Sequence, residues 1–182
     1  MANVHDVADF FIELARQSEH DDITPLKLNK LLYYAQGLYL AKTGTPLFDE
    51  PIEAWNLGPV VPVIYHKYKA CGRNPIESDE TDVAELFTDD EYSTLLDTAR
   101  EYGIYSASYL VDKTHTETPW LSTQRNSVID NALIAEYFSN LKPVCFEEII
   151  SNIPSIGRRD SDGYFVLPTN EKDEYWDEQY GT

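Results

Sequence analysis

The sequence predicts a mainly α-helical, compact single-domain fold with a small β-hairpin or sheet. Three observations carry this prediction: apolar residues recur at helical spacing over most of the chain, Ser and Thr stand at expected helix starts, and strand-like alternation is confined to a short run near residue 53. A chain of 182 residues suits one domain. We expect a helical domain over residues 1–157, then a C-terminal strand and an acidic, aromatic tail over residues 158–182.

Two helices are predicted at the N-terminal end. Residues 4–17 repeat apolar side chains at i, i+3, i+4 and i+7, which is typical of a helix with one buried face. The second helix has Thr24 as N-cap and Pro25 at its first position, and ends near Lys42, before Gly44. Its buried face is predicted to hold Leu28, Leu31, Leu32, Ala35, Leu38 and Tyr39, with Lys27, Lys30, Tyr33 and Tyr34 toward the flanks.

The small hairpin is predicted in residues 46–58, as two extended runs about a turn at residues 49–51. The Gly-Pro step that follows resembles an anion-binding turn, but Pro59 and Pro62 lack the N–H donors such a site needs, so we interpret it as an architectural corner. Further helices are predicted at residues 62–71, 81–86, 88–102, 106–114, 127–140 and 145–153, with Thr88, Ser106 and Ser127 as caps.

Charge excludes some classes of function. With 32 acidic and 14 basic side chains the net charge is −18, which repels phosphate backbones and anionic lipid, so neither direct DNA binding nor membrane association is expected. Residues 76–101 form an acidic face, whereas residues 27–73 form a basic stretch.

Without a signal peptide or a long apolar run the chain is expected in the cytoplasm, with Cys71 and Cys145 as reduced thiols.

Motif spacing offers no positive evidence for catalysis, a metal or a cofactor. His115 and Glu117 are two residues apart, but no third ligand follows at a metal-site spacing. No phosphate-binding loop or GxSxG elbow is present. We therefore expect a protein that is not an enzyme and has no cofactor. The alternative, an enzyme or binding protein for a small anionic ligand, would use the region of Lys27, Lys30, His66 and His115.

Binding to another protein is the function that the residue types favour, because basic and aromatic side chains are common at interfaces. The candidate partner-binding residues are Lys27, Lys30, Tyr33, Tyr34, Trp55, Lys67, Lys69, Trp120, Tyr175 and Trp176. In the alternative interpretation the lysines pair with the protein's own acids, the tyrosines are half-buried and the tail folds back. A third class, an acidic decoy that mimics nucleic acid, would bind unrelated basic proteins.

Several short motifs resemble those of the Panacea domain, or SocA-like antitoxin domain, a family also known as phage-associated proteins. The family pattern Leu-x-Lys-Leu-Leu-Tyr falls on residues 28–33, its Ala-Trp on Ala54 and Trp55, and its Gly-Pro-Val on residues 58–60. A second family segment is similar to residues 106–120, with Leu110, His115, Pro119 and Trp120 in register. The resemblance covers residues 23–138.

This resemblance implies the antitoxin of a toxin–antitoxin system, often carried by a prophage, that neutralises a cognate protein toxin by direct contact. It also implies, for some members, a proteolytic adaptor that delivers the toxin to a protease. Toxins implied by the family include translation inhibitors and alarmone-synthetase-like enzymes, and the acidic face favours a basic, RNA-targeting one. Some members carry a DNA-binding helix-turn-helix, but the residues before the motif predict one helix here. The oligomeric state is left open.

Overall fold

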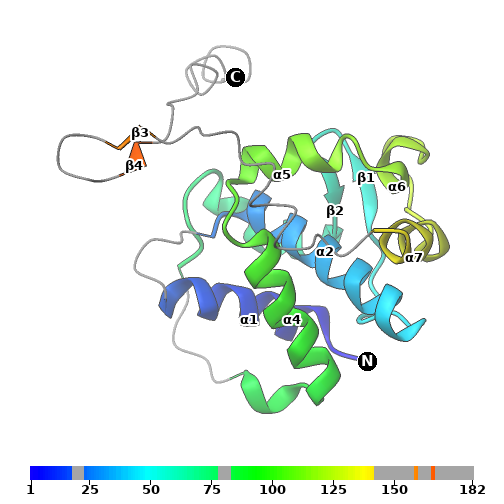
Figure 1. Cartoon of the computed structure of the whole chain (residues 1–182), viewed down its shortest axis with the longest axis horizontal. Helices are drawn as coiled ribbons and strands as arrows, with labels where there is room; N and C mark the ends of the chain where they lie inside the picture. The colour runs from blue at the N-terminus through cyan, green and yellow to red at the C-terminus, as the bar shows by residue number, and fades with distance from the viewer. Residues whose placement is uncertain (18–22, 78–82, 142–157, 160–164, 167–182) are drawn as a thin grey trace. The chain divides into compact units, whose positions relative to one another are not determined.

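The computed structural model describes residues 1–17, 23–77, 83–141, 158–159 and 165–166 (Figure 1). The chain divides into two units, Met1–Leu141 and Lys142–Thr182. The prediction of a mainly α-helical fold with a small antiparallel sheet is confirmed. The predicted domain boundary after residue 157 and the predicted helix at residues 145–153 involve residues outside those described, so both stay predictions.

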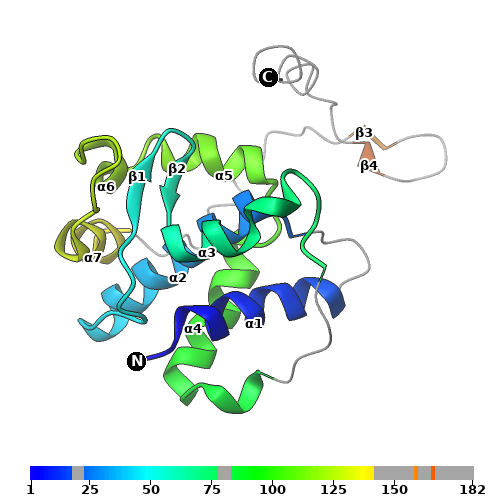
Figure 2. The same ribbon diagram turned by 180° about the vertical axis from the view of Figure 1, so that it is seen from behind.

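Helix α2 (Pro25–Thr43) is the central element of the first unit. It packs against α1 (Val4–Gln17), α4 (Asp89–Tyr102), α5 (Ala107–Thr114) and α7 (Asn131–Ser139), which lie on different sides of it (Figures 1 and 2). Its predicted ends are confirmed: the Thr24 hydroxyl accepts from the Lys27 N–H, and Gly44 closes the helix with φ of 72°. A helix surrounded in this way has almost no free face.

The expected position of four α2 side chains is therefore wrong. Lys27, Lys30, Tyr33 and Tyr34 are all buried, with exposed fractions of 7%, 0%, 0% and 0%. Apolar periodicity assigns one buried face to a helix, but a helix covered from several directions also buries the polar residues between the stripes. These four side chains are parts of the interior.

The hairpin exists, but its turn lies further along the chain than predicted. Strands β1 (Glu53–Trp55) and β2 (Gly58–Val60) pair antiparallel, with Glu53 opposite Val60 and Trp55 opposite Gly58. The chain reverses at residues 56–57. Gly58 follows this turn with φ of 94°, a conformation that glycine adopts more easily than other residues. The predicted turn at residues 49–51 is wrong, because the proline and acidic residues there mark a loop that leads into β1.

The other edge of β1 pairs with the segment before α7. The Ala54 N–H donates to the Ser127 carbonyl at 2.9 Å, and the Ile129 N–H donates to the Ile52 carbonyl at 2.7 Å. Ser127 also closes a turn, because its N–H donates to the Gln124 carbonyl at 3.0 Å, so the predicted helix start at residue 127 is wrong. Helix α7 begins at Asn131, with Asp130 as its N-cap.

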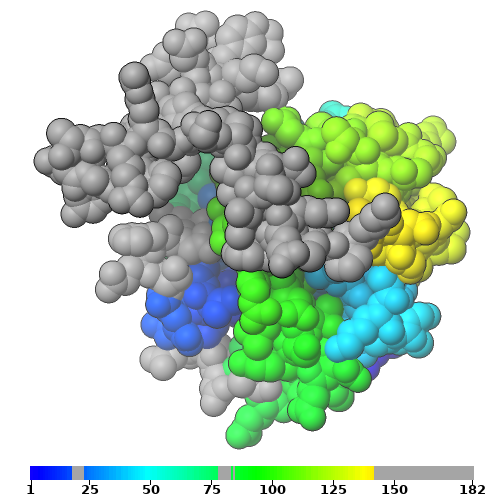
Figure 3. Space-filling model, viewed as in Figure 1, coloured from blue at the N-terminus to red at the C-terminus, as the bar shows by residue number. Residues whose placement is uncertain are grey.

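The remaining helices mostly follow the predicted caps. The first helix has its predicted bounds, Thr88 and Ser106 cap α4 and α5, and Thr88 forms a capping box with Glu91. Helix α3 (Pro62–Tyr68) and the 3₁₀ turn η1 (Lys69–Cys71) fill the predicted range 62–71, and η2 (Ala84–Leu86) falls within 81–86. The four-residue helix α6 (Thr118–Leu121) was not predicted. Figure 3 shows α4 and α7 beside the C-terminal half of α2.

In the second unit, β3 (Arg158–Arg159) and β4 (Phe165–Val166) form an antiparallel pair with Arg158 opposite Val166. One strand was predicted there, and the structure has two short ones. Among the described residues, no helix combines the length and the apolar character needed to cross a bilayer.

Candidate functional site

The structure separates the predicted partner-binding residues into three groups. The buried ones are Lys27, Lys30, Tyr33, Tyr34 and Trp120. Trp55 is half-buried, and Lys67 and Lys69 are exposed. Tyr175 and Trp176 lie outside the described residues. Among the described residues of this set, only Trp55, Lys67 and Lys69 can meet a partner without rearrangement of the first unit.

The Gly58-Pro59 corner is held from inside by α2. The Lys30 side-chain nitrogen, Nζ, donates to the Pro59 carbonyl at 2.9 Å, and the Val61 N–H donates to Asn29 Oδ1 at 2.9 Å. A Cβ atom on Gly58 would lie 2.6 Å from Thr114 Oγ1 and 2.8 Å from Lys30 Cε. Burial lowers the pKa of Lys30 to about 7. The interpretation as an architectural corner is confirmed, with a buried lysine as its support.

A second buried cluster surrounds Glu117, which precedes α6 and is 1% exposed. Its Oε1 accepts a hydrogen bond from the Tyr34 hydroxyl at 2.9 Å and lies 3.6 Å from Lys113 Nζ. The Tyr34 ring stacks on Tyr102, with centroids 3.8 Å apart. Burial raises the pKa of Glu117, although Lys113 and the tyrosine hydroxyls oppose the rise. The carboxylate thus ties α5 and α6 to the centre of α2.

Sequence reasoning missed this cluster because it considered Glu117 as a metal ligand beside His115. The Lys113–Glu117 spacing of four residues is the one local signal that could have suggested an ion pair. Among the described residues there is no group of three or more His, Cys, Asp or Glu side chains arranged to hold a metal ion.

Trp120 links α6 to the hairpin. Its Nε1 donates to the Trp55 carbonyl at 2.9 Å, and its ring stacks on His115 with centroids 4.0 Å apart. The Arg125 guanidinium lies 3.6 Å from the Trp120 ring centroid and also donates to the Trp55 carbonyl, at 3.3 Å. Burial, together with the positive charges of Lys30 and Arg125, lowers the pKa of His115. These contacts fix the position of Trp55 at the surface.

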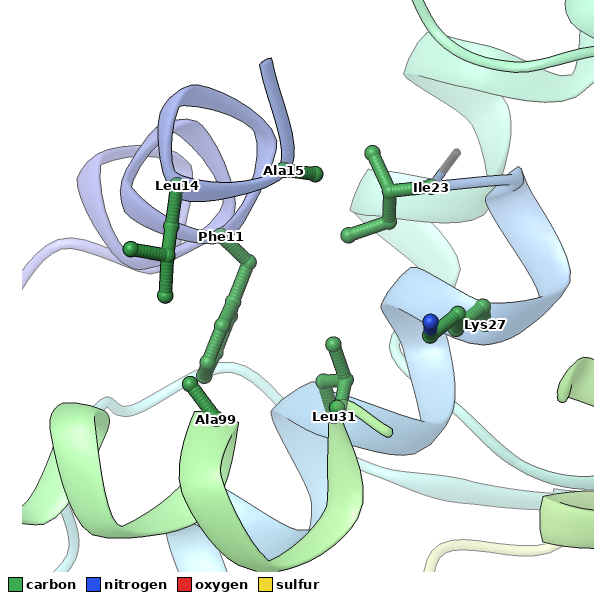
Figure 4. A pocket seen from close by; sticks show the side chains of 8 residues that line it. Phe11, Leu14, Ala15, Ile23, Lys27, Leu31 and Ala99 are labelled. Carbon is green, nitrogen blue, oxygen red and sulfur yellow. The ribbon is translucent and has the colours of Figure 1, made fainter. Parts of the chain in front are cut away.

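The residues proposed for an anionic ligand do not gather in one cavity. Lys27 lines a cavity of about 50 Å³ where α1, α2 and α4 meet, among apolar side chains such as Phe11 and Leu31 (Figure 4). Lys30 contacts the corner, His115 stacks on Trp120, and His66 is exposed on α3. Since small-molecule sites usually measure roughly 300–1,000 Å³, this cavity has room for little more than water.

The Glu117 cluster leads to a direct prediction. Replacing Tyr34 with phenylalanine removes the hydrogen bond that Oε1 of this buried carboxylate accepts at 2.9 Å, so we expect the free energy of unfolding to fall by about 1–3 kcal/mol. Urea denaturation at neutral pH measures this loss.

Tyr33→Phe is the matched control. Tyr33 is equally buried and precedes Tyr34, and its hydroxyl interacts electrostatically with Glu117, but it has no partner at hydrogen-bonding geometry among the described residues. Its loss should therefore change stability by less than about 1 kcal/mol. Equal losses in the two variants would contradict the assignment of the hydrogen bond to Tyr34.

Comparison with known proteins places this framework in a wider group. The family model described as "Antitoxin SocA-like, Panacea domain" matches residues 28–121, just over half of the chain. Antitoxin SocA of Caulobacter vibrioides (strain NA1000 / CB15N) is 48% identical over 50 residues. That alignment covers 28% of this chain and 27% of the relative. No solved structure matches. The matched range contains the whole corner and the Glu117 cluster.

Proposed function

Because this chain belongs to the family of SocA-like antitoxins that share the Panacea domain, we propose that it neutralises a cognate toxin by direct protein–protein binding. The family match is the observation that carries the proposal. The matched range includes residues of the corner and of the Glu117 cluster, and Lys30, Tyr34 and Trp120 among them are buried. The shared motifs therefore build a framework, and choice of partner falls to exposed residues.

Charge supports a basic toxin. Helix α4 exposes Asp89, Asp97 and Glu101, and the whole chain has a net charge of −18. Such a field accelerates encounter with a cationic protein, including one that acts on RNA, and salt screens it. An association rate that falls as salt is added is the expected result, and a rate indifferent to salt removes steering from the proposal.

Co-expression tests the function itself. The neighbouring open reading frame is expressed alone and together with this chain; we expect it to arrest growth alone, and the pair to restore growth and to copurify as a stoichiometric complex. Absence of both rescue and complex would refute the proposal. Rescue accompanied by loss of the toxin protein would indicate a proteolytic adaptor instead.

Deletion of residues 169–182 separates the tail from the folded unit in the same assay. These residues include Tyr175 and Trp176. Unchanged rescue would remove the tail from the interface, whereas lost rescue with an unchanged thermal unfolding temperature would place essential contacts in it.

A further inference from the structure

The β1–β2 hairpin lies beside α3 on the first unit (Figure 2), and two half-buried aromatic side chains, Trp55 and Tyr65, form a strip from one element to the other. Trp55 is half-buried, its Nε1 donates to Glu53 Oε2 at 2.7 Å, and its ring meets Tyr65 edge-on with centroids 4.8 Å apart. Two exposed apolar side chains adjoin it: Leu57 in the hairpin turn is 49% exposed, and Val128, which bridges Glu53, is 57% exposed. The strip is therefore a fixed apolar surface open to solvent.

Two cations flank this strip, and neither is paired within the described part of the chain. Arg125 donates to the Trp55 carbonyl, and Lys69 follows Tyr65 by four residues, with its N–H donating to the Tyr65 carbonyl. Both side chains are exposed, and neither forms an ion pair with a described residue. Trp55 and Tyr65 connect the two positions.

Elsewhere on the first unit, four exposed cationic side chains have acidic partners. The ion pairs are Arg16–Glu13, Lys42–Asp90, Lys67–Asp9 and Arg100–Asp97. In a chain with 32 acids and 14 bases, intramolecular pairing is easy to satisfy. Two cations that form no ion pair with a described residue thus lie beside one half-buried tryptophan.

We propose that the strip of Trp55, Tyr65, Lys69 and Arg125 binds an acidic segment of the toxin, and this inference rests on the proposed function. Carboxylates of that segment would pair with Lys69 and Arg125, and an apolar side chain beside them would pack on Trp55. A held indole flanked by cations suits such a segment, because Trp and Arg dominate the energetics of many protein interfaces. The basic body of such a toxin would contact the acidic face, and its acidic segment would bind this strip.

A nucleic acid could also offer negative charges to Lys69 and Arg125 and a base to Trp55, but the observations favour an acidic protein segment. The strip contributes two cations, whereas binding to a phosphate backbone generally uses many, and the field of a chain with net charge −18 opposes it. A short acidic segment needs only local complementarity, since salt screens charges beyond about 8–10 Å.

The test uses the full chain and the product of the neighbouring open reading frame. The double variant Lys69→Glu, Arg125→Gln is compared with the control Lys42→Glu, Arg16→Gln, which makes the same change of net charge at paired surface positions. We expect the dissociation constant to rise at least about tenfold for the strip variant and less than about threefold for the control. Thermal unfolding verifies that both variants are folded.

A zero-length carbodiimide crosslink gives an independent readout. It joins an amine to a carboxylate in direct contact, so mass spectrometry should find Lys69 linked to an Asp or Glu of the toxin. If the wild-type chain binds no toxin, the proposed function fails. If it binds, but the two double variants bind equally and Lys69 forms no crosslink, only the strip assignment fails. If the wild-type chain binds an oligonucleotide and the strip variant does not, the assignment of the strip to an acidic protein segment is also wrong.

Discussion

Replacement of Gly58 by alanine should destabilise the first unit by about 2–5 kcal/mol, enough to abolish most of the stability of a marginal domain. Gly58 has φ of 94°, a conformation that costs a residue with a Cβ roughly 1–2 kcal/mol. The new methyl group would also lie 2.6 Å from Thr114 Oγ1 and 2.8 Å from Lys30 Cε. Both contacts involve buried side chains of other elements, so relief requires movement of α2, α5 or β2.

Gly44→Ala is the matched control, because it separates backbone strain from overpacking. Gly44 also has positive φ, 72°, but an added Cβ would meet no described atom within 4 Å. It should cost only the conformational part, about 1–2 kcal/mol. Urea denaturation of both variants at one pH measures the difference.

A second change tests the contact itself. Thr114→Ala removes the closest atom, so in the double variant with Gly58→Ala part of the loss should be recovered, which gives a measurable coupling energy. Equal destabilisation by Gly58→Ala and Gly44→Ala, without coupling to Thr114, would show that the corner tolerates a side chain.

Local signals explain which elements could be predicted from the sequence. The caps Thr24, Thr88 and Ser106 bond to N–H groups within three residues, so the sequence next to each helix start contains the whole interaction. Ser127 has an equally suitable side chain, but its carbonyl accepts from the Ala54 N–H. A contact across 73 residues cannot be recognised from the residues next to the helix.

The residues of the candidate site also differ in whether local sequence signals could reveal their positions. The family resemblance selected Lys30, Tyr33 and Trp120, but helical periodicity placed Lys30 and Tyr33 toward the flanks of α2, whereas the structure buries them. Tyr34 and Glu117 are 83 residues apart in sequence, so nothing local indicated their hydrogen bond. Arg125 was not among the predicted residues at all, because its importance comes from its contacts with Trp120 and the Trp55 carbonyl.

Lys30 should make the protein more stable as pH rises from about 7 to about 10, with a slope approaching about 1.4 kcal/mol per pH unit. Its pKa is about 7 in the folded chain and ordinarily 10.5. Between these values the unfolded chain binds a proton that the folded chain does not, so rising pH removes a free-energy advantage of the unfolded state. His115, whose pKa is lowered from its ordinary 6.5, adds a rise of the same sign, but only below about pH 6.5.

Other buried groups limit the range of this effect. The pKa of Glu117 is raised in the folded chain, so its contribution to stability falls with rising pH. This fall is confined to the range between pH 4.5 and the pKa of Glu117 in the folded chain. Tyr33, Tyr34 and Tyr102 also have raised pKa values, mainly from burial, so above about pH 10 the unfolded chain loses protons that the folded chain keeps. Stability should therefore pass through a maximum near pH 9–10.

Lys30→Met separates the contribution of Lys30 to the pH dependence of stability from the contributions of the other groups. Methionine fills the space of the buried side chain but has no ionisable group. The variant loses the hydrogen bond to the Pro59 carbonyl at every pH, which lowers its whole stability curve, but the part of the rise due to Lys30 should disappear. Urea denaturation at constant ionic strength, from about pH 7 to about pH 9.5, measures both slopes. Parallel profiles would mean that Lys30 keeps its charge inside the fold, in which case the ammonium group and not a neutral amine holds the corner.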